Sequence, residues 1–319
     1  MSELVFYSLF LPPADPRPDL LRQLLTSVQT LREHNRGVDV VVFIHGDLPP
    51  ELEAALAPYD VRFHLQGSYE ARLARLCPAG WPALRLYPLL HKFLNFTEIA
   101  AMRPRQALFL DCDTIFFGDV GRLFAGYGDA HCYAREEPTC ARSHYGYDPG
   151  YLDEEALARL AGSVGVRSPP PFNLGAVLFN HGVWDALQGL DGTFVTCAWR
   201  LLVWLALNPD ARRSGYGEME PVRLLRQHLD RLATPGDVRG ALPYPSANEW
   251  ILDQVALWLT LGHVQGLVCG DFSPAEVLQN GEMLSRPAPR PEWILCHYFT
   301  QNMPRLEEWL HASAIATHD

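Results

Sequence analysis

Two aspartates separated by one residue, Asp111 and Asp113, are the side chains of this sequence best placed to do chemistry. They directly follow the apolar run Ala107–Leu110, and the chain turns apolar again through Phe117. Two carboxylates with this spacing at the end of a strand can both reach one hard divalent cation. Solvated loop aspartates are common, but stray charges embedded between two apolar runs would be costly. The pattern favours a Mn²⁺ or Mg²⁺ site, whose ion would bridge diphosphate oxygens and neutralise a leaving group.

Other polar side chains also lie where apolar segments begin or end. Asn173 stands at the entrance of one apolar run, and His297 follows another. A neutral imidazole is a good ligand for Mn²⁺, and a planar amide offers both a donor and an acceptor to hydroxyl groups. Asp253 and Gln254 open a helix-like pattern. The ordinary alternatives are a turn cap for Asn173, a plain helix start for Asp253 and Gln254, and a structural role for a lone histidine.

Hydrophobic periodicity predicts the elements that position these side chains. In the first half, apolar runs of strand length are predicted at Leu4–Leu11, Val38–Ile44, Val61–Leu65, Gln106–Leu110 and Ala130–Tyr133. Helices are predicted at Leu20–Leu31, Pro49–Leu56, Tyr69–Leu76 and Pro88–Ala101. Strands that alternate with helices predict an α/β fold with a mostly parallel sheet and helices on both faces. In such sheets ligands bind at the carboxyl ends of the strands.

The second half of the chain is less regular. It contains predicted strands at Phe172–Phe179, Val264–Cys269 and Trp293–Cys296, and a predicted helix at Asn248–Leu261. The segment 207–245 is rich in Arg, Pro and Gly, and we interpret it as a helical excursion with loops, most helical at Val222–Leu232. We expect residues 1–319 to form a single domain.

Composition and charge exclude several classes of protein. With 48% hydrophobic and 20% charged residues the chain has a globular profile. The net charge of −11 argues against a general nucleic-acid binder, which needs clustered Lys and Arg. A ligand that carries phosphates would need a bound cation to attract it. No glycine-rich phosphate loop follows the first strand, which disfavours the usual dinucleotide fold.

The cysteines and apolar segments predict a soluble cytoplasmic protein. The cysteines are odd in number and scattered without a CxxC pair, which favours reduced thiols over a disulfide framework or a zinc site. They are Cys77, Cys112, Cys132, Cys140, Cys197, Cys269 and Cys296. The first apolar run lacks the basic residues of a signal peptide. The most hydrophobic stretch, Ala198–Leu207, is too short to span a membrane and contains Arg200.

Four segments resemble the GT-A-fold glycosyltransferases, and most of all family 8, the glycogenin- and galactosyltransferase-like branch. They are the DxD segment Phe109–Phe116, the strand Phe172–Asn180, the helix start Asn248–Gln254 and the histidine segment Cys296–Tyr298. All four occur in the family's order, and with the first strand they span residues 4 to about 300. Each is weak alone, and together they are fairly specific.

The resemblance implies a metal-dependent transfer of a sugar from a nucleotide-diphosphate sugar, with a UDP-sugar favoured, to an acceptor with retention of configuration. It implies a GT-A fold and a Mn²⁺ or Mg²⁺ ion held by Asp111, Asp113 and His297. It also implies that a cation on or just before the helix that precedes the DxD strand contacts the diphosphate, although a solvated helix face is the alternative for Arg85 and Lys92. The residues predicted as catalytic are Asn173, Asp253 and Gln254, and those predicted to bind the donor are Tyr7, Ser8, Arg85, Lys92, Asp111, Cys112, Asp113 and Gly175.

Three other functions stay open at this point. A haloacid-dehalogenase-type phosphatase also uses a strand-ending DxD, but there the motif normally opens the fold. A nucleotidyltransferase on a similar sheet would need a Gly-rich, basic loop after the first strand, which is missing here. A non-catalytic sugar-nucleotide-binding relative is the third alternative, and the presence of all three implied metal ligands speaks against it.

Overall fold

A computed structural model describes residues 2–11, 18–66, 90–136, 154–167, 169–170, 172–207, 252–279, 282–298 and 302–316. Its strands are β1 (Glu3–Leu11), β2 (Asp39–Gly46), β3 (Val61–Gln66), β4 (Gln106–Leu110), β5 (Thr114–Phe116), β6 (Cys132–Glu136), β7 (Phe172–Asn180), β8 (Cys269–Asp271), β9 (Val277–Leu278) and β10 (Leu295–His297). Its α-helices are α1 (Pro18–His34), α2 (Pro50–Leu56), α4 (Leu90–Met102), α5 (Gly121–Gly126), α6 (Glu154–Ser163), α7 (Trp184–Gln188), α8 (Asp191–Leu207), α11 (Leu252–Leu261) and α12 (Met303–Ala316). Short 3₁₀ turns lie at Ala57–Tyr59, His181–Val183 and Glu282–Ser285.

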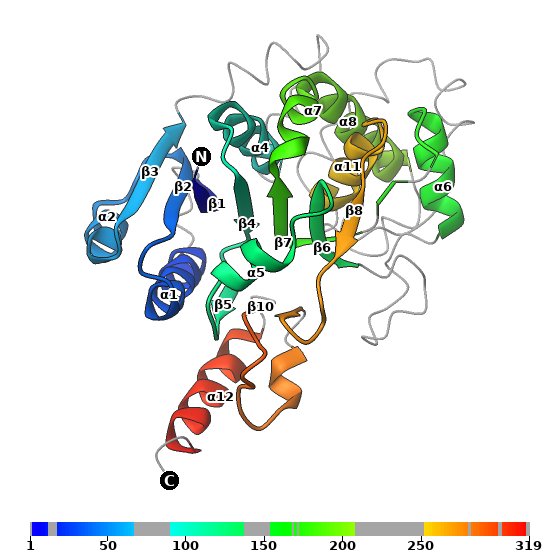
Figure 1. Cartoon of the computed structure of the whole chain (residues 1–319). Helices are drawn as coiled ribbons and strands as arrows, with labels where there is room; N and C mark the ends of the chain where they lie inside the picture. Colours follow the sequence, from blue (N-terminus) through cyan, green and yellow to red (C-terminus); the bar gives the residue numbers. More distant parts are fainter. Residues whose placement is uncertain are drawn as a thin grey trace.

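The centre of the molecule is a mixed, mostly parallel seven-stranded sheet in the order β3-β2-β1-β4-β7-β6-β8 (Figure 1). The strands β3, β2, β1 and β4 run parallel to one another. The strand β7 is antiparallel to both of its neighbours, β4 and β6, and β8 is parallel to β6. The carboxyl ends of the first four strands therefore meet at one edge of the sheet, where β4 runs into Asp111.

Helices cover both faces of this sheet. Because side chains alternate along a strand, β4 directs Phe109 to one face and Leu108 and Leu110 to the other. On the Phe109 face the core includes side chains of α4, α6, α7, α8 and α11. On the opposite face it includes side chains of α1, α2 and α5. The predicted α/β class with helices on both faces is thus confirmed.

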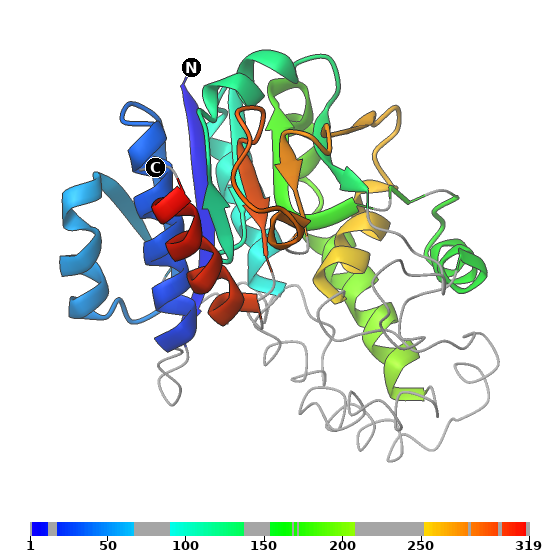
Figure 2. The ribbon, with the colours of Figure 1, turned by 90° about the horizontal axis from the view of Figure 1, so that it is seen from below.

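A second, smaller sheet with the order β5-β10-β9 lies beside the first. Its middle strand β10 is antiparallel to β5 and parallel to β9. A separate apolar cluster packs this sheet against α12 through Trp293, Tyr298 and Leu306. Figure 2 shows α12 alongside α1, where Arg22 and Glu307 form an exposed ion pair with an N–O distance of 3.3 Å. The small sheet thus joins the C-terminal part of the chain to the face covered by α1.

Most of the predicted elements are confirmed, with boundary shifts of at most three residues, except that the start of the predicted helix Asn248–Leu261 lies outside the described residues. The predicted strand Val264–Cys269 is wrong, because Val264 and Leu267 donate backbone hydrogen bonds within successive turns and Gly266 has a φ of +73°. The strand begins only at Cys269, where pairing with β6 starts. The predicted helices Tyr69–Leu76 and Val222–Leu232 lie outside the described residues, as does almost all of the segment 207–245. Within the described ranges, no helix is both long and apolar enough to cross a bilayer.

Candidate functional site

The segment from Asp111 to Asp113 connects the two sheets. The Asp111 amide donates a hydrogen bond to the Gly175 carbonyl on β7 (2.9 Å), and the Tyr298 amide donates one to the Asp113 carbonyl (2.8 Å). Between them, Cys112 is 4% exposed and packs in the apolar cluster with α1 and α5. The backbone of the two aspartates is therefore held from both sides, by the large sheet and by the end of the small sheet.

His297, the last residue of β10, completes a cluster with these carboxylates. Its Nε2 atom lies 3.3 Å from Asp113 Oδ1 and 3.9 Å from Asp111 Oδ2. One ligand atom from each of the three residues lies within 4.8 Å of the other two. Within the described part of the chain this is the only group of three or more His, Cys, Asp or Glu side chains with such spacing.

The glycine at position 175 makes room for the imidazole. A Cβ atom added at Gly175 would overlap the Nδ1, Cγ and Cε1 atoms of His297. Gly175 lies in β7 one residue before the register with β4 begins, and its backbone is held by two hydrogen bonds: its carbonyl accepts one from the Asp111 amide, and its amide donates one to Asn173 Oδ1. The absence of a side chain at this position is what lets His297 approach the aspartates.

The charges around His297 favour its protonated form in the metal-free protein. Burial by itself lowers the pKa of His297, but the nearby Asp113 and Asp111 outweigh burial, and the pKa is raised above its ordinary value of 6.5. Lys92 on α4 adds a second cation, with its Nζ atom 2.8 Å from Asp111 Oδ1. The two carboxylates thus stabilise positive charge on Lys92 and on the protonated form of His297 in a largely buried position.

The same features fit a divalent metal ion. Two carboxylate oxygens and one imidazole nitrogen form a donor set that suits Mn²⁺, and the oxygens also suit Mg²⁺. The carboxylate and imidazole side chains are 18–21% and 8% exposed respectively, so they are neither fully solvated nor fully sealed from a ligand. The cluster lies at the carboxyl end of β4, the edge at which α/β sheets bind their ligands.

Two buried amides brace the strand beside the cluster. Asn173 Oδ1 accepts a hydrogen bond from the Gly175 amide (2.8 Å), and Gln254 Oε1 on α11 accepts one from the Leu174 amide (2.5 Å). Both side chains are 4% exposed. These two predicted site residues therefore fix the first residues of β7, against which His297 packs. The side chain of Asp253 and the whole of Arg85 lie outside the described residues.

The predicted donor-binding residues of β1 have different surroundings. Tyr7 is fully buried, and its hydroxyl lies 2.9 Å from Ser27 Oγ on α1. Burial raises the pKa of Tyr7 well above its ordinary value of 10.0. The structure thus places the Tyr7 side chain in the core between β1 and α1, with its hydroxyl beside Ser27. Donor contact by Tyr7 stays a prediction.

Ser8 belongs to a polar network that sequence reasoning missed. Asn95 on α4 donates a hydrogen bond to Ser8 Oγ (2.6 Å), and its Oδ1 atom lies 3.2 Å from His45 Nε2 on β2. Asn95 stands three residues after Lys92, so both side chains project from the same side of α4. The signals that could have found it are a polar residue within the apolar stripe of a helix and a histidine at the end of an apolar strand.

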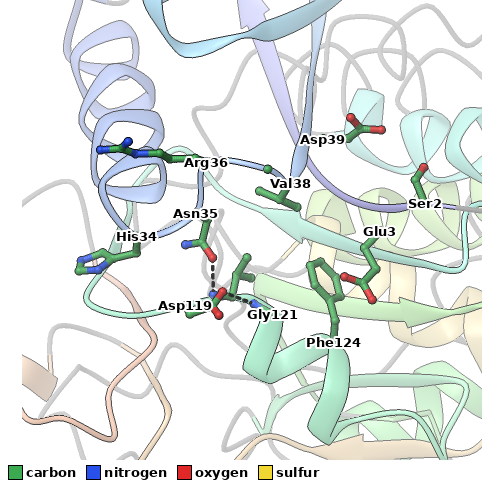
Figure 3. Close-up of a pocket in the computed structure, with 12 residues that line it drawn as sticks. Ser2, Glu3, His34, Asn35, Arg36, Val38, Asp39, Asp119, Gly121 and Phe124 are labelled. Carbon is green, nitrogen blue, oxygen red and sulfur yellow. Dashed lines mark hydrogen bonds between the residues drawn. The ribbon is translucent and has the colours of Figure 1, made fainter.

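A cavity lies at the opposite end of the parallel strands. It has a volume of about 450 Å³ and is lined by Ser2, Glu3, Asp39 and Asp119, among others, at the start of β1 and β2 (Figure 3). In it, Asn35 Oδ1 accepts a hydrogen bond from the Val120 amide at 2.7 Å, and Asp119 Oδ1 accepts one from the Gly121 amide at 2.8 Å. Because β1, β2 and β4 are parallel, the amino ends of these strands lie away from Asp111. This cavity is separate from the cluster of Asp111, Asp113 and His297.

Comparison with known proteins gives matches in structure only. No family model matches the sequence, and no curated protein matches it either. The galactosyltransferase LgtC, in complex with donor and acceptor sugar analogs, is 11% identical with a TM-score of 0.47 over 98% of this chain and 95% of its own. Mouse xyloside xylosyltransferase 1, in its apo form, is 12% identical with a TM-score of 0.46 over 93% and 97%.

A third similar structure is the apo form of the glycosyltransferase GlyE of Streptococcus pneumoniae TIGR4. It is 16% identical with a TM-score of 0.45, over 98% of this chain and 60% of its own. The three named structures are glycosyltransferases. Because the sequence identities and TM-scores are low, no residue of the present chain takes a role from them.

Proposed function

We propose that this protein is a metal-dependent glycosyltransferase that moves a sugar from a nucleotide-diphosphate sugar to an acceptor. The observation that carries the proposal is the cluster of Asp111, Asp113 and His297 at the carboxyl end of β4, with Lys92 beside it. Two carboxylates and an imidazole supply a cation site, and a cation is what an acidic chain needs in order to attract a diphosphate. Two of the four family-like sequence segments, Phe109–Phe116 and Cys296–Tyr298, contain both aspartates and the histidine.

In this proposal each group has a distinct task. When bound, a Mn²⁺ or Mg²⁺ ion held by Asp111, Asp113 and His297 would neutralise the departing nucleoside diphosphate. Lys92 Nζ, 2.8 Å from Asp111, supplies a further positive charge to the same phosphates. Asn173 and Gln254 keep the start of β7 in place through its backbone amides. Their remaining amide groups, with Asp253, would orient the donor sugar.

Several finer points belong to the proposal and rest on the family resemblance alone. They are retention of configuration, the preference for a UDP-sugar, and Mn²⁺ as the favoured ion. That residues 1–319 form a single GT-A domain also remains a proposal, as does donor contact by Arg85, Ser8, Cys112 and Gly175. The cytoplasmic location rests on the scattered cysteines.

Donor hydrolysis and thermal shift test the proposal together. The protein is melted with and without Mn²⁺ in the presence of UDP-, GDP- and dTDP-sugars, and release of nucleoside diphosphate is measured. We expect stabilisation by one sugar nucleotide that requires the metal, since a ligand of the folded state raises its stability by mass action. Asp113→Asn should abolish both the stabilisation and the hydrolysis.

A matched aspartate variant provides the control. Asp185→Asn removes an 80% exposed carboxylate whose partner is Arg103, away from the cluster, and should leave both readouts unchanged. Metal-dependent binding without turnover would indicate a non-catalytic relative. Hydrolysis of phosphomonoesters without any response to sugar nucleotides would refute the proposal in favour of a phosphatase.

A further inference from the structure

Two cysteines face each other at the edge of the central sheet. Cys132 on β6 and Cys269 on β8 are direct partners in the parallel pairing of these strands, which lie side by side in Figure 1. Their Sγ atoms are 2.9 Å apart. Neighbouring strands are about 4.8 Å apart, which is within the Cα separations that disulfides span. The backbone therefore already holds the two sulfur atoms at a distance from which a bond can form with a small movement.

The two thiols differ in access to solvent. Cys132 is 1% exposed, whereas Cys269 is partly exposed on the edge strand. The hydrogen bond between them lowers the pKa of Cys269, while this hydrogen bond together with burial raises the pKa of Cys132. The accessible sulfur is therefore also the better nucleophile, because the thiolate is the reactive form.

We propose that Cys132 and Cys269 form a redox-active dithiol, which a peroxide oxidises to a reversible disulfide. The Cys269 thiolate attacks one oxygen of hydrogen peroxide, so that the O–O bond breaks, hydroxide leaves and Cys269 becomes a sulfenic acid. Cys132 then attacks the Cys269 sulfur, the S–O bond breaks, and the hydroxyl departs with the Cys132 proton as water. Overall two thiols lose two electrons and two protons, and one peroxide becomes two water molecules.

The bond would join segments that are distant along the chain. The two cysteines are separated by 137 positions, so the disulfide closes a very long loop. It would also tie down the edge strand β8, which pairs with β6 at only three positions. Downstream of β8, the Phe272 amide donates to the Ala134 carbonyl (3.0 Å), which continues the attachment to β6. We expect oxidation to strengthen the attachment of this edge to the sheet.

Peptide mapping of the full-length protein tests the proposal directly. Reduced, desalted protein is treated with increasing hydrogen peroxide, its remaining thiols are blocked with N-ethylmaleimide, and it is digested without reductant. We expect one cross-linked species that contains Cys132 and Cys269, lighter by two hydrogen atoms than the sum of its peptides and lost on treatment with dithiothreitol. The oxidised protein should also melt about 5 °C higher than the reduced protein.

Single variants test the order of attack. In Cys132→Ala, oxidation should stop at a sulfenic acid on Cys269 that dimedone traps, and in Cys269→Ser the buried Cys132 should stay a thiol. Cys197→Ala is the matched control, because Cys197 is a buried cysteine of α8 whose partner is Thr260, and this variant should still form the disulfide. Recovery of Cys132 and Cys269 of the wild type as separate maleimide adducts after peroxide, or a disulfide from either one to another cysteine, would overturn the proposal. The mapping of the wild type decides this even if a variant does not fold.

Discussion

Replacing Gly175 by alanine should displace His297, one of the three proposed metal ligands, although none of the three is itself substituted. The new Cβ would occupy the space of the His297 ring, overlapping its Nδ1, Cγ and Cε1 atoms. The Gly175 carbonyl accepts a hydrogen bond from the Asp111 amide at 2.9 Å, the Gly175 amide donates one to Asn173 Oδ1 at 2.8 Å, and the register with β4 begins at the next residue, Ala176. Since the backbone is held, the imidazole has to turn away from the aspartates.

The size of the effect follows from this geometry. Forcing an extra methyl group into a packed interior costs about 1–3 kcal/mol of folding free energy. Disturbing even the supporting groups of a metal site lowers affinity roughly 10–100-fold, and here a ligand itself is displaced. We therefore expect Gly175→Ala to bind Mn²⁺ at least about tenfold more weakly than the wild type and to be destabilised by about 2 kcal/mol without metal.

Calorimetric titration of the metal-free protein with Mn²⁺ and a thermal melt measure the two quantities. Gly128→Ala is the control, because a Cβ at Gly128 meets nothing within 4 Å. In the double variant Gly175→Ala/His297→Ala the obstacle is gone, so the alanine at 175 should add little destabilisation to that of His297→Ala alone. Wild-type affinity for Mn²⁺ in Gly175→Ala would refute the reasoning, because Mn²⁺ binding would then not require the His297 imidazole at the position that the structure gives it.

Three further predictions concern the neighbouring charges and the first strand. Lys92→Met removes the cation 2.8 Å from Asp111. In a titration, Mn²⁺ alone should bind a few-fold more tightly, because the competing positive charge is lost, whereas donor turnover should fall. Weaker Mn²⁺ binding in this variant would contradict the prediction. Because the pKa of His297 is raised in the metal-free fold, its bound proton stabilises that fold at acidic pH and this stabilisation is lost as the pH rises through the raised pKa. The same proton competes with Mn²⁺, so affinity measured across pH should fall by up to about tenfold per unit as the pH drops below that pKa. Tyr7→Phe deletes the hydrogen bond to Ser27 and should lower the free energy of unfolding, measured in urea, by about 1 kcal/mol. Donor turnover should be unchanged. A large loss of turnover at full stability would indicate that Tyr7 contacts the donor.

The part of the site that lies on regular elements could be predicted from the sequence. The five residues of β4 are all buried, and the apolar run Ala107–Leu110 within it predicted both the strand and the position of Asp111 at its end. All nine residues of β7 are buried as well, and apolar residues predominate among them. The alternation of such runs with helical stripes was sufficient for the fold class, because each stripe reflects one face packed on the sheet.

What the sequence could not show depends on contacts between distant segments. The strands β5 and β9 have three and two residues, too few for a periodic pattern, and β10 was predicted at Trp293–Cys296 but its pairing with β5 and β9 was not. The helix α8 is apolar around much of its surface and lacks the polar stripe that would mark it as helical. The burial of the Tyr7 hydroxyl could not be predicted either. Side chains of β1 alternate between the two faces of the sheet, and only the packing of α1 determines that the Tyr7 side chain is covered.

The proposed metal ligands are divided between two sheets, and this has a consequence for how the protein folds. Asp111 and Asp113 extend from the large sheet, whereas His297 arrives on the middle strand of the small one. The site is therefore absent until a segment near the end of the chain has docked onto a framework built mostly from its first half. Bringing such remote segments together is a slow, entropically demanding step. A divalent ion that joins all three side chains would trap the docked arrangement, so the ion's first effect on a newly made chain would be to complete its folding.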